Sequence, residues 1–237
     1  MSFGLCSFAS FSTSFEPVAG TDFEARPFEP STGRQLEVGV KYQPIGADTL
    51  LTAALYRLTQ HNVLTADPTP GRETFSVQTG EAQVNGLSLE ARTRLSRVDL
   101  LASYAWTDAE YTRANPSASG TSLLGRPLVR TPRHQAAAWA SYRVGDEGRG
   151  WVLSLGARYI GSNVSDTGQT IVLPARTLVD AAIHYDFGQR ESLMDRVRLT
   201  LGLANLGDRE YVSYCLGAMQ CFYGQPRTVQ LSLRKRW

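Results

Sequence analysis

Apolar and polar residues alternate along much of this chain, and this alternation limits the folds open to it. In "QLEVGVKY" (35–42) every second residue is apolar, and the residues between them are polar or glycine. A period of two is typical of β-strands with two different faces. Few helical patterns appear. The chain is therefore predicted to be all-β, with about ten strands. They are 35–42, 153–160, 179–187, 197–204 and 228–237, with weaker patterns at 4–15, 49–60, 83–93, 98–107 and 135–143.

The connections between these segments alternate in length. Short connections are expected at 44–48, 94–97, 144–150 and 188–196, and long ones at 16–34, 61–74, 108–133, 161–175 and 205–226. Outer-membrane barrels have short periplasmic turns, long extracellular loops and spanning strands of about 9–11 residues. A soluble β-sandwich also alternates apolar and polar faces, but its strands are usually about 5–6 residues long. The pattern favours an antiparallel transmembrane β-barrel, with a soluble β-sandwich binding module as an alternative.

The barrel interpretation assigns the two faces of each strand. Hydrocarbon cannot satisfy backbone N–H and C=O groups, so one face must be apolar and every strand must pair laterally. Charged residues then fall on the luminal face: Glu37, Lys41, Glu90, Arg92, Arg158, Asp180, Asp186 and Arg198. Aromatic residues at strand ends fit interfacial girdles: Tyr42, Tyr104, Trp106, Tyr142, Trp151, Tyr159 and Phe187. Lys235 is expected on the lipid face, near enough to the strand end to snorkel. The pattern does not orient Trp139.

Composition argues against several other classes. Lys+Arg is 24 and Asp+Glu is 22, without a basic stripe, so no nucleic-acid partner is expected. No apolar run reaches roughly 18 residues, which excludes a transmembrane helix. The start, "MSFGLCSFASFSTSFEP", has no basic region before a continuous apolar core, so it is not predicted to be a signal peptide.

The chain shows no catalytic or metal-binding pattern. His61, His134 and His184 are not at metal-ligand spacing. Asp180 and Asp186 share a strand face but lie about 20 Å apart along it, too far for joint acid–base chemistry. The chain is therefore not expected to be an enzyme.

The end of the chain resembles a protein family. "ANLGDREYV" (204–212) followed by "CLGAMQCFYG" (215–224) is similar to the end of TonB-dependent siderophore receptors of the ferrichrome and hydroxamate type. That family usually reads N-L-F-D-[KR]-E-Y-V, then C-x5-C-[FY]-[WY]-G, then a last strand ending in an aromatic residue. Gly207 stands where phenylalanine is usual. Other stretches that fit are 11–23, 33–44, 79–91, 102–112 and 131–142, so the resemblance covers nearly the whole chain.

This resemblance implies a cell outer membrane receptor that takes up a ferric siderophore, of hydroxamate type, with energy supplied by the TonB complex. The iron belongs to the siderophore, so no resident cofactor is expected. Family members have a signal peptide, an N-terminal plug domain and a 22-stranded barrel. Residues 1–237 match about its last ten strands and are predicted to be the C-terminal part of the barrel, without the plug and the TonB-contacting segment. The alternative is a small passive outer-membrane channel, closed from ten strands.

The two cysteines near the end, Cys215 and Cys221, admit three interpretations: a disulfide, half of a metal site, or two free thiols. Zinc usually takes four ligands at tighter cysteine spacing, and no histidine lies nearby in sequence. In an oxidising compartment a bridge is the default, and the family match places it in the last extracellular loop.

The resemblance also nominates binding and assembly residues. Phe222 and Tyr223 are candidate siderophore contacts, with loop packing as the alternative interpretation, and Tyr111 in the 108–133 loop is a weaker candidate. The residues between the two cysteines contain no aromatic side chain, unlike many relatives. Trp237 resembles the terminal aromatic signal read by the outer-membrane assembly machinery, and the alternative interpretation is an interfacial anchor.

Overall fold

The computed structural model describes residues 4–72, 74–116, 120, 122–145, 150–166, 168–188, 197–217 and 219–235. Ten long strands carry the fold: β1 (Leu5–Glu16), β2 (Ser31–Tyr42), β3 (Thr49–Ala66), β4 (Ser76–Leu95), β5 (Val98–Arg113), β6 (His134–Val144), β7 (Gly150–Ile160), β10 (Arg176–Asp186), β11 (Val197–Ala204) and β14 (Thr228–Lys235). Four short strands lie in the connections: β8 (Asn163–Val164), β9 (Val172–Leu173), β12 (Val212–Gly217) and β13 (Gln220–Tyr223). The all-β prediction is confirmed, but the sequence pattern did not reveal these four strands.

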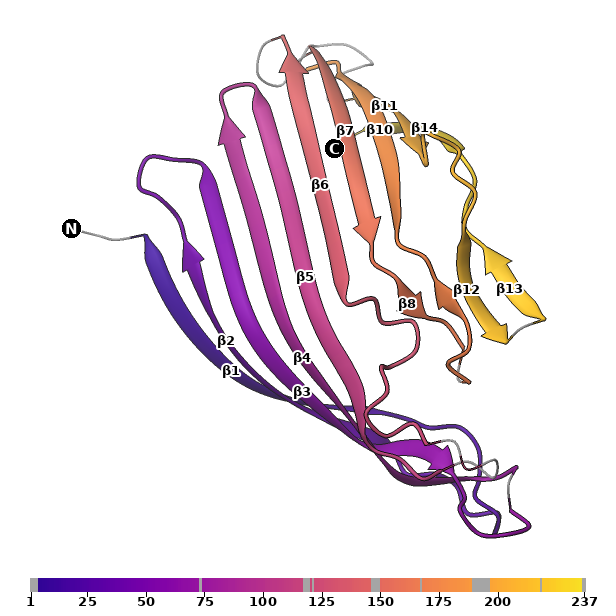
Figure 1. Cartoon of the computed structure of the whole chain (residues 1–237). Coiled ribbons are helices and arrows are strands. Elements are labelled where there is room, and N and C mark those ends of the chain that lie inside the picture. Colours follow the sequence, from indigo (N-terminus) through magenta and orange to yellow (C-terminus); the bar gives the residue numbers. More distant parts are fainter. Residues whose placement is uncertain are drawn as a thin grey trace.

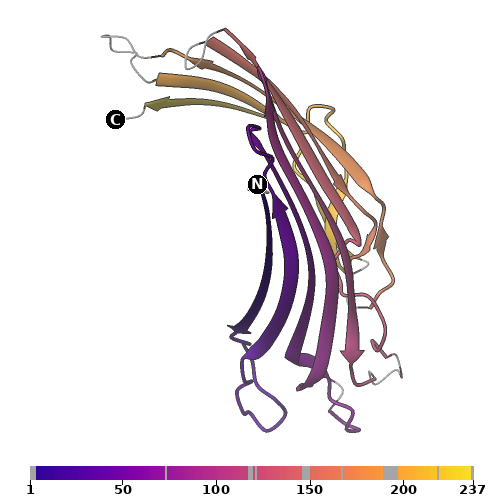
Figure 2. The same ribbon diagram turned by 90° about the vertical axis from the view of Figure 1, so that its left-hand side faces the viewer.

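The long strands form one antiparallel sheet in the order β1-β2-β3-β4-β5-β6-β7-β10-β11-β14 (Figure 1). Seen from the side, this sheet is a curved wall (Figure 2). A sandwich requires two large packed sheets, so that alternative is wrong. Within the described residues, β1 and β14 each pair with a single neighbour, so the sheet does not close on itself. Because β1 and β14 do not pair with each other, the structure contradicts a small channel closed from these ten strands.

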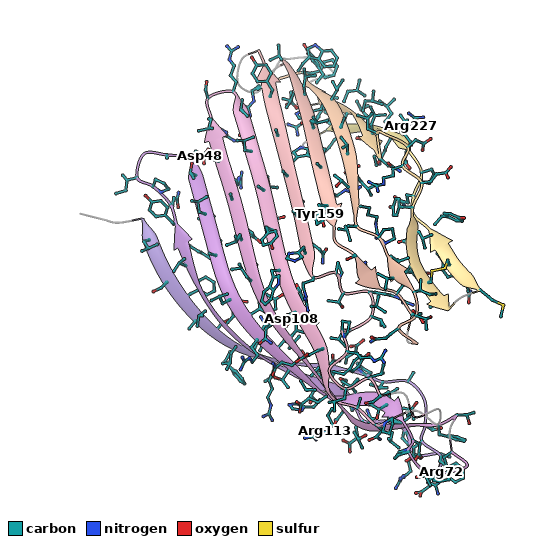
Figure 3. All side chains as sticks on the ribbon, in the orientation of Figure 1. Asp48, Arg72, Asp108, Arg113, Tyr159 and Arg227 are labelled. Carbon is teal, nitrogen blue, oxygen red and sulfur yellow. A yellow bond between two sulfur atoms is a disulfide. The ribbon has the colours of Figure 1, made fainter. Side chains whose placement is uncertain are left out.

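Short turns connect the strands at one end of the sheet and long loops at the other, as the alternation predicted. Asp48, in the turn between β2 and β3, and Arg72, in the loop between β3 and β4, mark these opposite ends (Figure 3). We call them the turn end and the loop end. The described residues contain no helix long and apolar enough to cross a bilayer.

Three strands are longer than predicted. At the loop end β3 continues to Ala66, β4 begins at Ser76 and β5 continues to Arg113. The ladder between β3 and β4 has two irregular positions there, near Val63 and Thr65. The expected bounds ended near residue 60, residue 83 and residue 107. The prediction failed there because the outward face of these extensions becomes polar, so the apolar alternation that identifies a spanning strand stops before the ladder does.

The outward face of the sheet carries a band of mostly apolar side chains. Register places Val38 beside Leu55, Leu55 beside Leu87, and Leu87 beside Trp106. Several apolar side chains of this face are largely exposed: Leu36 is 61% exposed, Leu155 56% and Leu231 69%. Toward the loop end the outward positions change to Arg57, paired with Asn85. The apolar side chains therefore form a band that ends before the loop end of the sheet, as a bilayer requires.

Aromatic side chains border this band at both ends. At the turn end, Trp151 packs on Tyr185 and Tyr185 on Phe187, each pair with ring centroids 4.8 Å apart. At the loop end, Tyr104 and Tyr159 both pair with Ala136, and the Tyr104 hydroxyl lies 2.9 Å from Nδ1 of His134. The predicted girdles are present.

The luminal face carries ion pairs between neighbouring strands. Asp180 on β10 accepts two hydrogen bonds from Arg158 on β7, at 2.7 and 3.1 Å. Asp186 accepts two from Arg198, at 2.6 and 2.9 Å. The two aspartates thus serve separate cross-strand pairs. Lys235 pairs with Val197 on the outward face, as expected.

The structure orients Trp139, which the sequence did not. Trp139 lies opposite Gly156, on the luminal face with Asp180. A Cβ on residue 156 would overlap the indole ring, so glycine at this position is required for the aromatic side chain to lie flat across the strand.

Candidate functional site

The most elaborate local structure lies at the loop end, in the connection between β11 and β14. Strands β12 and β13 form a hairpin that the Cys215–Cys221 disulfide closes, with the two Cα atoms 4.0 Å apart. The rings of Tyr214 and Phe222 stack beside it with centroids 4.6 Å apart. The predicted disulfide is present, in a loop as expected, and it clips a hairpin whose strands already pair.

Ser165 attaches this hairpin to the loop between β7 and β10. Its hydroxyl accepts a hydrogen bond from the backbone N–H of Cys215 at 2.6 Å and donates to the carbonyl of the same residue at 3.4 Å. Ser165 and Cys215 are both almost fully buried. Because the hydroxyl serves as donor and acceptor, its burial leaves neither of these two roles unsatisfied.

Arg130 connects the loop between β5 and β6 to both the hairpin and the loop that carries Ser165. Its backbone N–H donates to the carbonyl of Val164 at 2.6 Å. Its guanidinium donates to the carbonyls of Ser165 and Cys215, and lies 4.8 Å from the centre of the Tyr214 ring. One side chain thus contacts both neighbouring loops.

Asp166 shapes the loop that carries Ser165. Burial alone would raise the pKa of Asp166. Its carboxylate, however, accepts hydrogen bonds from the backbone N–H groups of Thr170 and Ile171, at 3.0 and 2.7 Å, and one from the Thr170 hydroxyl at 3.0 Å. These bonds outweigh burial and lower the pKa of Asp166 below its ordinary value.

Asn205 fastens the base of the hairpin loop. Its amide Nδ2 donates to the carbonyls of Arg209 and Gln225, at 3.0 and 3.1 Å, and its Oδ1 accepts from the Arg209 N–H at 2.9 Å. Its own N–H donates to Asp180 at 2.8 Å. The side chain is 3% exposed, and its φ of 51° is one that asparagine tolerates well. Asn205 therefore joins both ends of this loop to the luminal wall.

The remaining motif residues complete this base. Asp208 accepts a hydrogen bond from the N–H of Arg227 at 2.8 Å. The Tyr211 ring lies where a Cβ on residue 224 would be, so only glycine fits at Gly224. The two parts of the sequence motif, 204–212 and 215–224, are thus joined at this base, through Tyr211 and Gly224.

We call the assembly formed by the described residues of loops 114–133, 161–175 and 205–227 the three-loop clamp. Sequence reasoning identified Asn205 and Asp208 as motif residues but missed Ser165 and Arg130. Their contacts join residues 50 and 85 positions apart, and no periodic pattern marks such pairs.

The candidate binding residues are placed as follows. Phe222 is packed on Tyr214, whereas Tyr223 is 78% exposed at the hairpin edge. Tyr111 lies within β5 rather than in a loop, and its backbone pairs with Gly125 and Arg126 of the clamp. This corrects the expected position. No described contact joins Tyr111 to Phe222 or Tyr223, and their role as ligand contacts stays a prediction.

Trp237 lies outside the described residues, so its role as an assembly signal also stays a prediction. Among the described residues, no group of three or more His, Cys, Asp or Glu side chains is placed to hold a metal ion.

An apolar outward band, two aromatic girdles, a charged inner face and alternating turn and loop lengths define the wall of an outer-membrane β-barrel. The chain belongs to the family described as TonB-dependent receptor-like, β-barrel, whose pattern matches residues 3–206.

Curated relatives agree with this assignment. The chain is 38% identical over 228 residues to the ferrichrome outer membrane transporter/phage receptor of Escherichia coli (strain K12), covering 95% of this chain and 29% of that relative. It is 35% identical over 230 residues to the ferrioxamine B receptor of Salmonella typhimurium (strain SL1344), covering 95% and 31%. The chain thus spans about a third of the length of the relatives it matches.

Solved structures share the fold. The siderophore receptor PiuA from Acinetobacter baumannii superposes with a TM-score of 0.75 at 22% sequence identity, over 97% of this chain and 33% of that chain. The unliganded ferric citrate transporter FecA gives a TM-score of 0.72 at 22% identity, over 96% and 35%.

Proposed function

We propose that this chain forms the wall and part of the outer mouth of a receptor that takes up ferric siderophores of the hydroxamate type, energised by TonB in the full-length protein. The observation that carries the proposal is the 38% identity to a ferrichrome transporter over 95% of the chain. The ferrioxamine B receptor supports the same ligand class. In this proposal iron enters as the cargo of the siderophore, and the chain contributes transport rather than catalysis.

The three-loop clamp fits such a role. It places Tyr223 on an exposed hairpin edge while burying Ser165 and Asn205 beneath it. A rigid base under exposed side chains lowers the conformational entropy lost when a ligand binds. Phe222 and Tyr223 are the candidate ligand contacts of this edge, and Tyr111, on β5, is the third candidate.

A chimeric receptor tests the proposal. This chain would replace the matching section of the E. coli ferrichrome transporter, in a strain lacking that transporter, and uptake of radioactive iron from ferrichrome and ferrioxamine B would be measured. We expect uptake that disappears in a TonB-deficient strain. A chimera present at normal surface abundance that takes up neither chelate would refute the proposal.

A further inference from the structure

Two arginines on the outward face lie where the apolar band ends. Arg57 on β3 pairs with Leu36 on β2, and Arg34 on β2 pairs with Thr59, two residues further along β3. Both arginine side chains are exposed. Diagonal neighbours on one face of an antiparallel pair lie roughly 7–8 Å apart, so both guanidinium groups are close enough to bind the same ligand.

The two guanidinium groups have hydrogen-bond donors to offer. Nε of Arg57 donates to Oδ1 of Asn85 at 2.8 Å. Within the part of the chain that the structure describes, no hydrogen bond or ion pair involves the terminal nitrogens of Arg57 or the side chain of Arg34. The hydroxyls of Thr13 and Thr59, on either side of Arg34, have no described partner either. The donors of this site therefore come from three neighbouring strands.

The carboxylates of the outward face lie away from this pair. The outward faces of β1, β2 and β3, whose residues the structure describes in full, carry no acidic side chain. On β4 and β5 the outward carboxylates toward the loop end are Glu81, Asp108 and Glu110. Glu81 lies 3.1 Å from Nδ1 of His61, and Asp108 pairs with Arg133 at 2.7 Å. Glu110 is three strands from Arg34, roughly 15 Å away at the usual strand spacing.

Apolar side chains adjoin the arginines on the side of the turn end. Phe11 and Leu36 lie in the same cross-strand row as Arg57, and Val38 is the next outward residue of β2. All three are largely exposed. In a bilayer, hydrocarbon chains cover such side chains, and the lipid headgroups lie at the border of the hydrocarbon region. The arginines are therefore at headgroup level and the three apolar side chains at acyl-chain level.

We propose that Arg34 and Arg57 bind the phosphate of a membrane lipid in the leaflet at the loop end, with its acyl chains on Phe11, Leu36 and Val38. Guanidinium groups bind phosphate through parallel charge-assisted hydrogen bonds. A free phosphate ion would use the arginines but leave the apolar side chains uncovered, so continuity with the apolar band favours a lipid. The site faces away from the lumen, and this inference does not depend on the siderophore.

Phosphatidic acid and diacylglycerol with identical acyl chains test the proposal, because they differ only in the phosphate. The purified chimera, in a neutral detergent, is titrated with each lipid, and native mass spectrometry measures the bound fraction. We expect phosphatidic acid to bind at least about tenfold more tightly than diacylglycerol. Inorganic phosphate in excess should not displace it, because the ion makes no contact with the apolar band.

Variants then assign the preference to this site, since the rest of the chimera is unchanged. Arg34→Gln and Arg57→Gln should each weaken the binding of phosphatidic acid roughly fivefold and leave that of diacylglycerol unchanged. The matched control is Arg92→Gln, which removes an exposed arginine from the luminal face of β4 and should change neither affinity. Heat-modifiable migration on a gel confirms that each variant is folded.

Three results would overturn the inference. The first is equal binding of phosphatidic acid by the unsubstituted chimera and by the double variant Arg34→Gln/Arg57→Gln. The second is an equal loss in Arg92→Gln, which would assign the effect to net charge. The third is displacement by inorganic phosphate, which would make the site one for a free anion. Iron uptake enters none of these measurements, so the proposed function stands or falls separately.

Discussion

Two groups of loops at the same end of the sheet are fixed in different ways. The loops between β1 and β2 and between β3 and β4 contact each other through exposed or partly exposed groups: Phe23 packs edge-on against Phe75, and Arg72 lies 3.9 Å from the centre of the Phe23 ring. The three-loop clamp is joined instead by buried polar groups, including Ser165 and Asn205.

The difference predicts different responses to mutation. Removing one partner of a buried hydrogen bond leaves the other unsatisfied, whereas an exposed group exchanges its lost partner for water. Equivalent substitutions in the two groups should therefore have unequal effects, and the chain contains matched pairs of residues that allow this comparison.

The largest difference is expected between Asn205 and Asn62. Both have positive φ, 51° and 58°, and glycine adopts either conformation, so replacement by glycine isolates the side-chain hydrogen bonds. Asn205 makes three, and Asn62 makes one to the carbonyl of Pro30 at 3.1 Å. Asn205→Gly should lower the local opening free energy of the 205–227 loop by roughly 2–3 kcal/mol. Asn62→Gly, in β3, should lower that of the β1–β2 loop, which its side chain contacts at Pro30, by less than about 1 kcal/mol.

Hydrogen exchange of backbone amides in detergent micelles measures both opening free energies. Equal losses at the two asparagines would show that burial does not separate the two groups of loops.

The disulfide should have the next largest effect. A closed loop as short as that between Cys215 and Cys221 is expected to stabilise the folded hairpin by roughly 2 kcal/mol. In the denatured, unreduced protein only Cys6 should react with a thiol reagent, and all 3 cysteines should react after reduction. Mass spectrometry counts the labels, and more than one label without reductant contradicts the bridge.

Much of the fold was predictable, and the reason is the bilayer. A strand between lipid and lumen must alternate, so the ten long strands and the girdle residues Tyr42 and Trp151 followed from the sequence. The extensions of β3 to β5 did not, because outside the hydrocarbon the outward face is no longer required to be apolar. The clamp was only partly predictable: the motif marks Asn205, but nothing near Ser165 in sequence indicates its partner 50 residues away.

A smaller contrast is expected between two buried serines. Ser165 joins two loops, whereas Ser31 donates to the carbonyl of His61 at 2.9 Å and accepts from Gln60, where the ladder between β2 and β3 already pairs the backbone. Ser165→Ala should lower the protection of the 212–223 amides by about 1–2 kcal/mol, and Ser31→Ala should cost about half as much at its own site. A hairpin whose hydrogen exchange is unchanged in Ser165→Ala would show that Arg130 suffices to dock it.

The smallest contrast concerns two aspartates, Asp166 in the clamp and Asp22 in the other group of loops. Hydrogen bonds from the N–H and guanidinium of Arg26 lower the pKa of Asp22, and backbone N–H groups outweigh burial to lower that of Asp166. A lowered pKa contributes stability above the unfolded value, near 3.8, and this stability is lost as pH falls through the folded-state value. Both loops should therefore remain closed at pH 5.

Salt should separate these two aspartates. Asp22 and Arg26 form an ion pair at the surface, which mobile ions screen, whereas the N–H donors to Asp166 are neutral and Asp166 itself is buried. At pH 5, raising the ionic strength to about 1 M should speed amide exchange at Glu24 and Arg26, and leave Thr170 and Ile171 unchanged. Asp166→Asn should speed exchange at Thr170 and Ile171 at pH 5 and remove the acid-dependent step there. Equal salt sensitivity of the two loops would mean that solvent reaches the clamp as readily as it reaches the other loops. That result would contradict the conclusion that buried polar groups hold the clamp together.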